Sequence, residues 1–336
     1  MNSVALSSVH SHAALITALE THPAGIVFSG GQWQSTGAVS SDNNDAVITV
    51  YAPALTAWQL EKVSDALTPV ATLSGFRLHA LSGKFHETVV TGSIKTADVP
   101  GLKPLLEKLA ESLRVDIVVQ AARPSLSAPG LLVMDMDSTI IQIECIDEIA
   151  KLAGLGDKVA AVTAKAMRGE LAFSESLISR VACLKGVPVS QLAQIRDSIP
   201  LMPGVVPLVS VLKDHGWKIA IASGGFTYFA DHVKERLGLD AAFSNTLKTD
   251  GDVLAGEVTG EIVDAEVKAR TVESLASEWQ IPMSQTVAMG DGANDLVMMA
   301  KAALGVACHA KPLVREKADT TIRFSGLHGM LYLLAD

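Results

Sequence analysis

The stretch Leu131–Ile140, LLVMDMDSTI, decides the fold, because four apolar residues lead directly into two aspartates that are one residue apart. The apolar run predicts a buried strand. Side chains two apart in a strand share a face, so we expect Asp135 and Asp137 to point the same way. Two ionised carboxylates that close repel each other unless one is protonated or both share a cation. The pattern indicates a metal or a reaction at this strand end; the alternative is a solvated turn in which Ser138 or Thr139 caps a helix.

Two further predicted strands end in polar clusters, ASGGF (222–226) and MGDGAND (289–295). Strands and helices alternate from about residue 215 onward, which predicts a parallel sheet with helices on both faces. Ligands of such sheets bind beyond the carboxyl ends of the strands, so we expect the three clusters to meet at one edge. Asp291 and Asp295 could then complete the shell of a Mg²⁺ ion, which binds through carboxylates, water and phosphate oxygens.

The chain has 336 residues, which is enough for about two domains. Residues 1–125 predict an α+β domain in the order strand–helix–strand–strand–helix–strand, which is ferredoxin-like. This topology resembles the ACT-type modules attached to amino-acid enzymes, and either ligand sensing or homodimer formation is its expected role. A linker rich in Pro, Ser and Gly, 122–130, leads into the second domain, 126–336. Residues 142 to about 215 are predicted to form a helical insert.

Composition excludes several classes of partner. The formal net charge is -9, with 49% hydrophobic and 19% charged residues, so we expect no nucleic-acid partner. No stretch approaches roughly 18 uninterrupted apolar residues, and no signal peptide is evident, so we expect no membrane partner. Three widely spaced cysteines, Cys145, Cys183 and Cys308, indicate free thiols and a cytoplasmic location. The nine histidines are scattered and predict no metal site.

The clusters also carry a family resemblance. MDMDST (134–139) fits the DxDx[T/S] signature of the haloacid dehalogenase superfamily, and SGG (223–225), Lys268 and GDGAND (290–295) resemble its other motifs in the same order. Together with ECIDEIA (144–150) and ELAFSESLISRV (170–181), they resemble the phosphoserine phosphatase family. The superfamily motifs occur in order over residues 131–330, and the resemblance to phosphoserine phosphatases extends from the linker to the end of the sequence. It implies a Rossmann-like doubly wound parallel sheet with a small helical cap, and a phosphoric monoester hydrolase.

The resemblance implies the chemistry at the acidic strand ends. Asp135 would be the nucleophile that forms an aspartyl-phosphate, and Asp137 would be the general acid and base. Mg²⁺ would be held by the carboxylates of Asp135 and Asp291 and by the backbone carbonyl of Asp137.

The resemblance also implies a substrate-binding set and a supporting set. In the first set, Glu144 would bind the ammonium of the substrate and Arg180 its carboxylate, although each alone would be taken for an ordinary exposed helix charge. The remaining substrate-binding residues would be Ser223, Gly224, Lys268 and Asn294. The supporting residues would be Asp295, Met167, Phe173 and Gly225. The sequence departs from the family pattern at Cys145, where Thr is common, and at Ile178, where Arg is common.

The implied reaction is the hydrolysis of O-phospho-L-serine to L-serine and phosphate, the last step of serine biosynthesis. Two alternatives stay open at the level of the sequence. One is a related phosphomonoesterase or phosphotransferase with another small substrate. The other is a regulatory binding protein with an inactive core, against which the intact acidic and Lys268 positions argue.

Overall fold

The computed structural model describes residues 2–7, 9, 11–37, 46–168 and 170–336, with Met167 described by its backbone alone. Contacts divide the chain into two compact units: residues 1–125 with 320–336, and residues 126–319. The division after Ser125 lies within the linker predicted at 122–130. The predicted second domain, 126–336, differs from this division at its C-terminal end, because residues 320–336 belong with the first unit.

The first unit contains an antiparallel sheet with the strand order β4-β6-β3-β7, and β5 pairs with β6. Its elements are α1 (His12–Thr21), β1 (Ile26–Ser29), β2 (Gln32–Ser35), β3 (Ala46–Ala52), α2 (Ala57–Leu67), β4 (Thr72–Leu73), β5 (Arg77–Leu78), β6 (Thr88–Lys95), η1 (Pro100–Leu102), α3 (Lys103–Leu113), β7 (Asp116–Gln120), β14 (Thr320–Ile322) and η4 (Leu327–Leu333). The predicted succession of strands and helices is present from β3 to β7. Helix α1 and the β1–β2 hairpin were not predicted. The ACT-type identity of this unit and its sensing or dimerising role stay predictions.

Two buried carboxylates explain why residues 320–336 belong to the first unit. Asp116, on β7, accepts hydrogen bonds of 2.7–3.1 Å from the backbone N–H groups of residues 323–325. Glu87 accepts bonds from Ser325 Oγ at 2.9 Å and from His328 Nε2 at 3.0 Å. Because a buried carboxylate without donors is strongly destabilising, this sheet depends on the C-terminal segment for its hydrogen bonds.

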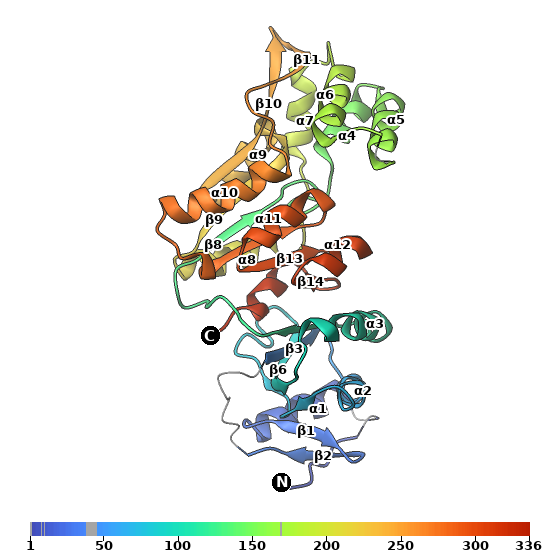
Figure 1. Cartoon of the computed structure of the whole chain (residues 1–336), viewed down its shortest axis with the longest axis vertical. Coiled ribbons are helices and arrows are strands. Elements are labelled where there is room, and N and C mark those ends of the chain that lie inside the picture. Colours follow the sequence, from blue (N-terminus) through green and yellow to red (C-terminus); the bar gives the residue numbers. More distant parts are fainter. Residues whose placement is uncertain (1, 8, 10, 38–45, 169) are drawn as a thin grey trace. The chain divides into compact units, whose positions relative to one another are not determined.

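The second unit contains a sheet whose strand order, within this unit, is β11-β10-β9-β8-β12-β13 (Figure 1). Strands β10, β9, β8, β12 and β13 run parallel, and β11 is antiparallel to β10. Its elements are β8 (Leu131–Met134), α4 (Cys145–Leu152), α5 (Gly156–Met167), α6 (Phe173–Cys183), α7 (Val189–Asp197), α8 (Val205–Asp214), β9 (Lys218–Phe226), α9 (Thr227–Leu237), β10 (Ala241–Asp250), β11 (Val253–Thr259), α10 (Ala265–Glu278), η2 (Met283–Gln285), β12 (Thr286–Gly290), η3 (Ala293–Asp295), α11 (Leu296–Lys301), β13 (Leu304–Cys308) and α12 (Pro312–Lys317). The predicted parallel α/β sheet is confirmed.

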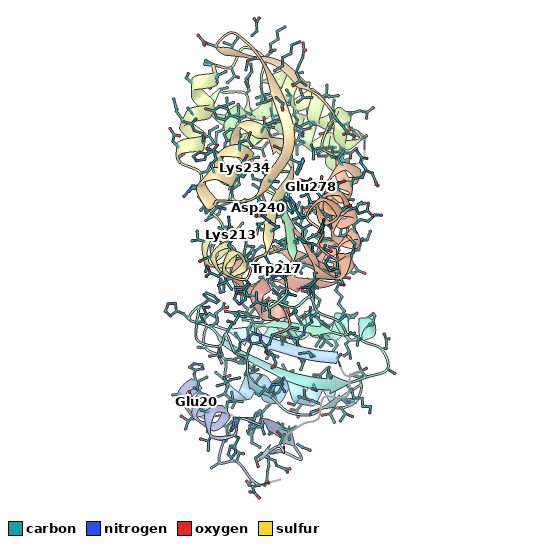
Figure 2. All side chains as sticks on the ribbon, turned by 90° about the vertical axis from the view of Figure 1, so that its left-hand side faces the viewer. Glu20, Lys213, Trp217, Lys234, Asp240 and Glu278 are labelled. Atoms are coloured by element: carbon teal, nitrogen blue, oxygen red, sulfur yellow. The ribbon has the colours of Figure 1, made fainter. Side chains whose placement is uncertain are left out.

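The parallel strands are buried on both faces. Alternate residues of β8, Leu131 and Val133, share a core with Val272 of α10 and Met298 of α11. Helices α8 and α9 contact β9 and add no side chain to that core, so they cover the other face (Figure 1). At the start of β9, Asp240 accepts bonds from Lys218 Nζ and from the Ile219 N–H at 2.8 and 2.9 Å; Asp240 is labelled in Figure 2.

Helices α4–α7 form the insert between β8 and α8. Backbone bonds close its base, from the Gln142 N–H to the Pro200 carbonyl (3.0 Å) and from the Met202 N–H to the Ile140 carbonyl (2.8 Å). The helical region predicted for 142–215 therefore divides into the insert proper and α8, which belongs to the sheet layers. No helix among the residues that the structure describes is long and apolar enough to span a membrane. All three cysteines lie in the described part of the chain, and none of them forms a disulfide there.

Candidate active site

A cavity of about 400 Å³ lies at the carboxyl edge of the sheet, under the insert. It brings together most of the predicted site residues, from β8, β9, β12 and the insert: Asp135, Asp137, Glu144, Phe173, Arg180, Ser223, Gly224, Gly225, Asp291 and Asn294. Lys268 and Asp295 lie behind this wall and are almost fully buried. The side chain of Met167 lies outside the described residues. The three strand ends therefore meet at one edge, as their order in the sequence predicts.

Asp135 is held at the floor of the cavity. Its N–H donates to the Met289 carbonyl at 2.9 Å, which continues the β8–β12 pairing. Its Oδ1 accepts from the Met136 N–H at 2.7 Å, and its Oδ2 lies 3.0 Å from Lys268 Nζ. The side chain is only 9% exposed, and these donors face its negative charge and fix its orientation.

Lys268, on α10, contacts two carboxylates. Besides Asp135, its ammonium contacts Asp295 Oδ1 at 2.7 Å, and Asp295 Oδ2 accepts from the Gly292 N–H at 2.9 Å. Burial alone would lower the pKa of Lys268, but Asp135 and Asp295 outweigh burial and raise that pKa above its usual value. The lysine is therefore a permanent positive charge beneath the cavity floor.

Asp137 lies in a turn and not in the strand. The sequence analysis explained the direction of the Asp137 side chain by the two-residue alternation of a strand. That explanation is wrong, because β8 ends at Met134 and the alternation does not extend to Asp137. The turn itself directs Asp137 to the cavity, where its Oδ2 accepts from the Cys145 N–H at 3.4 Å. Its Oδ1 is buried and has no hydrogen-bond partner among the described residues. Burial, followed by the charges of Glu144 and Asp135, raises the pKa of Asp137 well above its usual range.

An acidic cluster at this edge could hold a metal ion. Asp135, Asp291 and Asp295 each bring one carboxylate oxygen within 4.8 Å of the others. Asp291 accepts from Thr139 Oγ1 at 3.1 Å, and burial together with Asp135 raises its pKa to about 6. Asp295 is fully buried behind the cavity wall, whereas Asp135 and Asp291 line the cavity, so Asp135 and Asp291 are the better placed ligands. Such an all-oxygen donor set fits a hard divalent cation.

The end of β9 approaches the cavity closely through its glycines. A side chain on Gly225 would meet Met136 at 2.9 Å, and one on Gly224 would meet Phe173 of the insert at 2.8 Å. Ser223 Oγ accepts from the Gly225 N–H at 3.0 Å. Buried Asn245 donates to the Gly224 carbonyl at 2.9 Å and so fixes this loop.

The insert contributes one acid and one base to the cavity wall. Glu144 precedes α4, is exposed to the cavity, and accepts from Ser138 Oγ at 2.7 Å. Ser138 adopts a left-handed backbone with φ 56°, which is rare outside glycine. Arg180, on α6, is half-buried, and its Nε has no hydrogen-bond partner among the described residues. The two charges therefore offer an anionic and a cationic contact above the floor.

The sequence analysis did not identify several residues that support or line the site. Thr139 and Asn245 orient Asp291 and Gly224, and their importance depends on tertiary contacts. Lys311 and Leu313, which follow β13, also line the cavity. The sequence does contain a signal for these two residues, because they follow the buried run LGVAC of β13, another parallel strand of the same sheet.

Comparison with known proteins agrees with this geometry. A family model for haloacid dehalogenase-like hydrolases matches residues 130–303. Proteins named phosphoserine phosphatase from Vibrio cholerae and Haemophilus influenzae are 54% and 53% identical over 229 and 228 residues, covering 68% of this chain and 70% and 73% of theirs. A crystal structure of a probable phosphoserine phosphatase from Vibrio cholerae, unliganded, has a TM-score of 0.72 and 44% identity over 87% of this chain and 86% of that chain. The chain therefore belongs to the haloacid dehalogenase-like hydrolases and, among them, to the phosphoserine phosphatases.

Proposed function

We propose that the chain hydrolyses O-phospho-L-serine to L-serine and phosphate through an aspartyl-phosphate on Asp135. The relatives named phosphoserine phosphatase support the substrate. The pairing of a fixed, donor-bound carboxylate with a neighbouring carboxyl of raised pKa supports the mechanism, because covalent hydrolysis of a phosphoester needs one nucleophile and one proton donor.

In the first step, an Asp135 oxygen attacks phosphorus and the bond from phosphorus to the serine oxygen breaks. Asp137, whose raised pKa favours its protonated form, donates its proton to the departing oxygen, and L-serine leaves. In the second step, the ionised Asp137 takes a proton from water. The resulting hydroxide attacks phosphorus, the bond to Asp135 breaks, and phosphate leaves. Asp137 is then protonated again, so the cycle closes.

Mg²⁺ is the proposed metal, and Asp135, Asp291 and the Asp137 carbonyl would hold it. When bound, it would supply positive charge that lowers the repulsion between carboxylate and phosphate. Lys268 supplies a fixed positive charge from below the floor, independent of any metal. Ser223 and Gly224 would hydrogen-bond the phosphate oxygens, with Gly225 in support through its N–H bond to Ser223 Oγ, and Asn294 would contact the substrate from the η3 side.

The serine moiety would face the insert. Glu144 would pair with the ammonium and Arg180 with the carboxylate, for which the unpartnered Nε is a ready donor. Phe173 lies against Gly224 at the junction of insert and core, so it would exclude water from the phosphate. The lining role of Met167 stays a prediction from the sequence.

The fixed position of Asp135 is the observation that carries the proposal. We expect Asp135→Asn to lower phosphate release from phosphoserine by at least about a thousandfold, because an amide cannot form the covalent intermediate. Phosphate release is measured colorimetrically, and acid-quenched wild-type enzyme is analysed by mass spectrometry for a phosphorylated peptide containing residue 135. Asp214→Asn, at an exposed position on α8, is the matched control. Normal turnover by Asp135→Asn would refute the nucleophile assignment.

A further inference from the structure

We propose that Lys311 is a specificity-determining residue that binds the carboxylate of the substrate from the core side of the cavity. The inference rests on the proposed function and extends it, because Arg180 on the insert would otherwise be the sole cation facing that group. Lys311 precedes α12 and lines the same cavity as Asp135 and Arg180.

The charges around the cavity are unbalanced. Four acidic side chains line it, those of Asp135, Glu144 and Asp291 and that of Asp137, the proposed proton donor. Among the lining residues that the structure describes, Arg180 and Lys311 carry the positive charges. Lys268 lies behind the wall, where Asp135 and Asp295 already pair with it. A substrate with a phosphate and a carboxylate therefore requires positive charge at the wall, and Lys311 is one of two side chains that provide it.

The ammonium of Lys311 is available for a ligand. The structure shows no ion pair or hydrogen bond of this side chain with any residue in the ranges it describes. Lys311 follows His309, whose backbone has φ 49°, and buried Ala310. Left-handed residues other than glycine are costly and tend to occur at functional sites. The turn after β13 thus directs the chain past the sheet edge so that Lys311, Leu313 and Val314 form a wall of the cavity.

The position of Lys311 in the cavity favours contact with the carboxylate of the substrate over contact with its phosphate. The phosphate end belongs at the floor, where Asp135 and Ser223 are 6% and 1% exposed. Lys311 is exposed, as is Glu144, and Arg180 is half-buried, so all three lie toward the rim. The groups at this level would face the amino-acid end of the substrate. Lys311 on the core and Arg180 on the insert would then share the carboxylate.

The test compares two substrates that differ by the carboxylate alone, phosphoserine and phosphoethanolamine. We expect Lys311→Ala to raise KM for phosphoserine about threefold to tenfold with kcat nearly unchanged, the range of a partly exposed ion pair. For phosphoethanolamine, kcat/KM should not change. If phosphoethanolamine is not turned over, its inhibition constant against phosphoserine hydrolysis serves instead. Lys311→Arg should restore the phosphoserine KM. Lys317→Ala, at an exposed position on α12, the helix that follows Lys311, should change the kinetics of neither substrate.

Equal losses for both substrates, or an unchanged phosphoserine KM, would overturn the assignment of Lys311. Failure of the proposed function gives a different result, because the wild-type enzyme would then release no phosphate from phosphoserine. Circular dichroism and the thermal midpoint of each variant establish that it is folded. A misfolded variant would lose kcat on both substrates, which is distinct from the expected rise in one KM.

Discussion

Lys268 is the residue on which the charge balance of the site depends. It is 1% exposed and lies between Asp135 and Asp295, at 3.0 and 2.7 Å. Lys268→Met should lower the free energy of unfolding by about 3–5 kcal/mol, because it leaves two buried carboxylates without their cation. Phosphatase activity should fall as well, since the floor loses its fixed positive charge. Urea unfolding followed by tryptophan fluorescence, and kcat for phosphoserine, measure the two effects.

A second substitution separates stability from catalysis. Asp295→Asn in the Lys268→Met background removes one uncompensated charge and keeps an acceptor for the Gly292 N–H. The double variant should recover part of the lost stability, whereas activity should stay low because Asp135 still lacks its ammonium. Recovery of activity together with stability would show that Lys268 acts only by supporting the fold.

Individual residues differ in how far the sequence reveals them. Asp135 and Asp291 stand directly after buried strands and Asp137 follows two residues after Asp135, and this local pattern was enough to predict that they meet at one edge. Lys268 has no such pattern, and only the family resemblance singled it out. Thr139 and Asn245 were missed because each gains its importance from a partner distant in the chain, Asp291 and Gly224. Tertiary contacts of this kind leave no periodic signal in the sequence.

At the scale of elements, the junction between β9 and α6 joins the core to the insert. A side chain on Gly224 would approach the Phe173 ring to 2.8 Å. Gly224→Ala should therefore displace Phe173 and hold the insert slightly open, at a cost of about 1–3 kcal/mol for overpacking. We expect kcat/KM for phosphoserine to fall about tenfold, which corresponds to about 1.4 kcal/mol. Steady-state kinetics measure the change.

A second substitution, Phe173→Leu, replaces the ring by a smaller side chain and so makes room for the methyl group that Gly224→Ala adds. In the double variant, kcat/KM should be higher than in Gly224→Ala alone, and this coupling marks a direct contact. Gly186→Ala is a control for glycine replacement, since its added carbon meets no atom within 4 Å, although its φ of 83° adds backbone strain. Additive losses in the double variant would argue against Phe173 as the group displaced by Gly224→Ala.

Most elements follow from local patterns, and the exceptions have physical reasons. The predicted order of strands and helices in residues 1–125 includes α2 and α3, and the predicted alternation from about residue 215 includes α9 and α10. The three predicted strands that end in polar clusters are β8, β9 and β12. Helix α1 was missed because its ten residues carry apolar side chains on nearly all sides, with Leu15 and Leu19 alone buried. The β1–β2 hairpin was missed because its strands have four residues each. The end of the insert was extended to residue 215 because α8 is as helical in pattern as the helices before it.

At the scale of the whole molecule, the N-terminal unit is completed by the C-terminus. The sequence could not predict this, because residues 320–336 follow the phosphatase core without a linker signal. The connection depends on buried acceptors in β6, β7 and their neighbours, which bond to donors more than 200 positions later in the chain. Because these acceptors are the carboxylates of Asp116 and Glu87, we expect the stability of the first unit to depend on pH.

Glu87 provides the last prediction. Burial alone would raise its pKa, but the bonds from His328 and Ser325 outweigh burial and lower it below the usual 4.5. Stability from this group is therefore present above about pH 4.5 and is lost as pH falls through the lowered pKa. Glu87→Gln should lower the stability of the first unit by about 1 kcal/mol at neutral pH, since the neutral amide keeps an acceptor and loses the charge-assisted bonds.

The difference between wild type and Glu87→Gln should shrink as the pH is lowered from neutral toward about 4. Asp116 titrates in the opposite sense, because burial raises its pKa to about 6. Burial acts on Asp116 in both proteins, but the charge of Glu87 also raises that pKa, so Glu87→Gln removes this smaller contribution and part of the Asp116 titration remains in the difference. Hydrogen exchange of β3 and β6 amides, measured by mass spectrometry in each protein, reports the stability of the first unit. Glu61→Gln, also buried but bonded to Trp33 and not to the C-terminal segment, is the control. A stability difference that stays constant with pH would mean that Glu87 supports the unit by its shape and neutral bonds, and not by its charge.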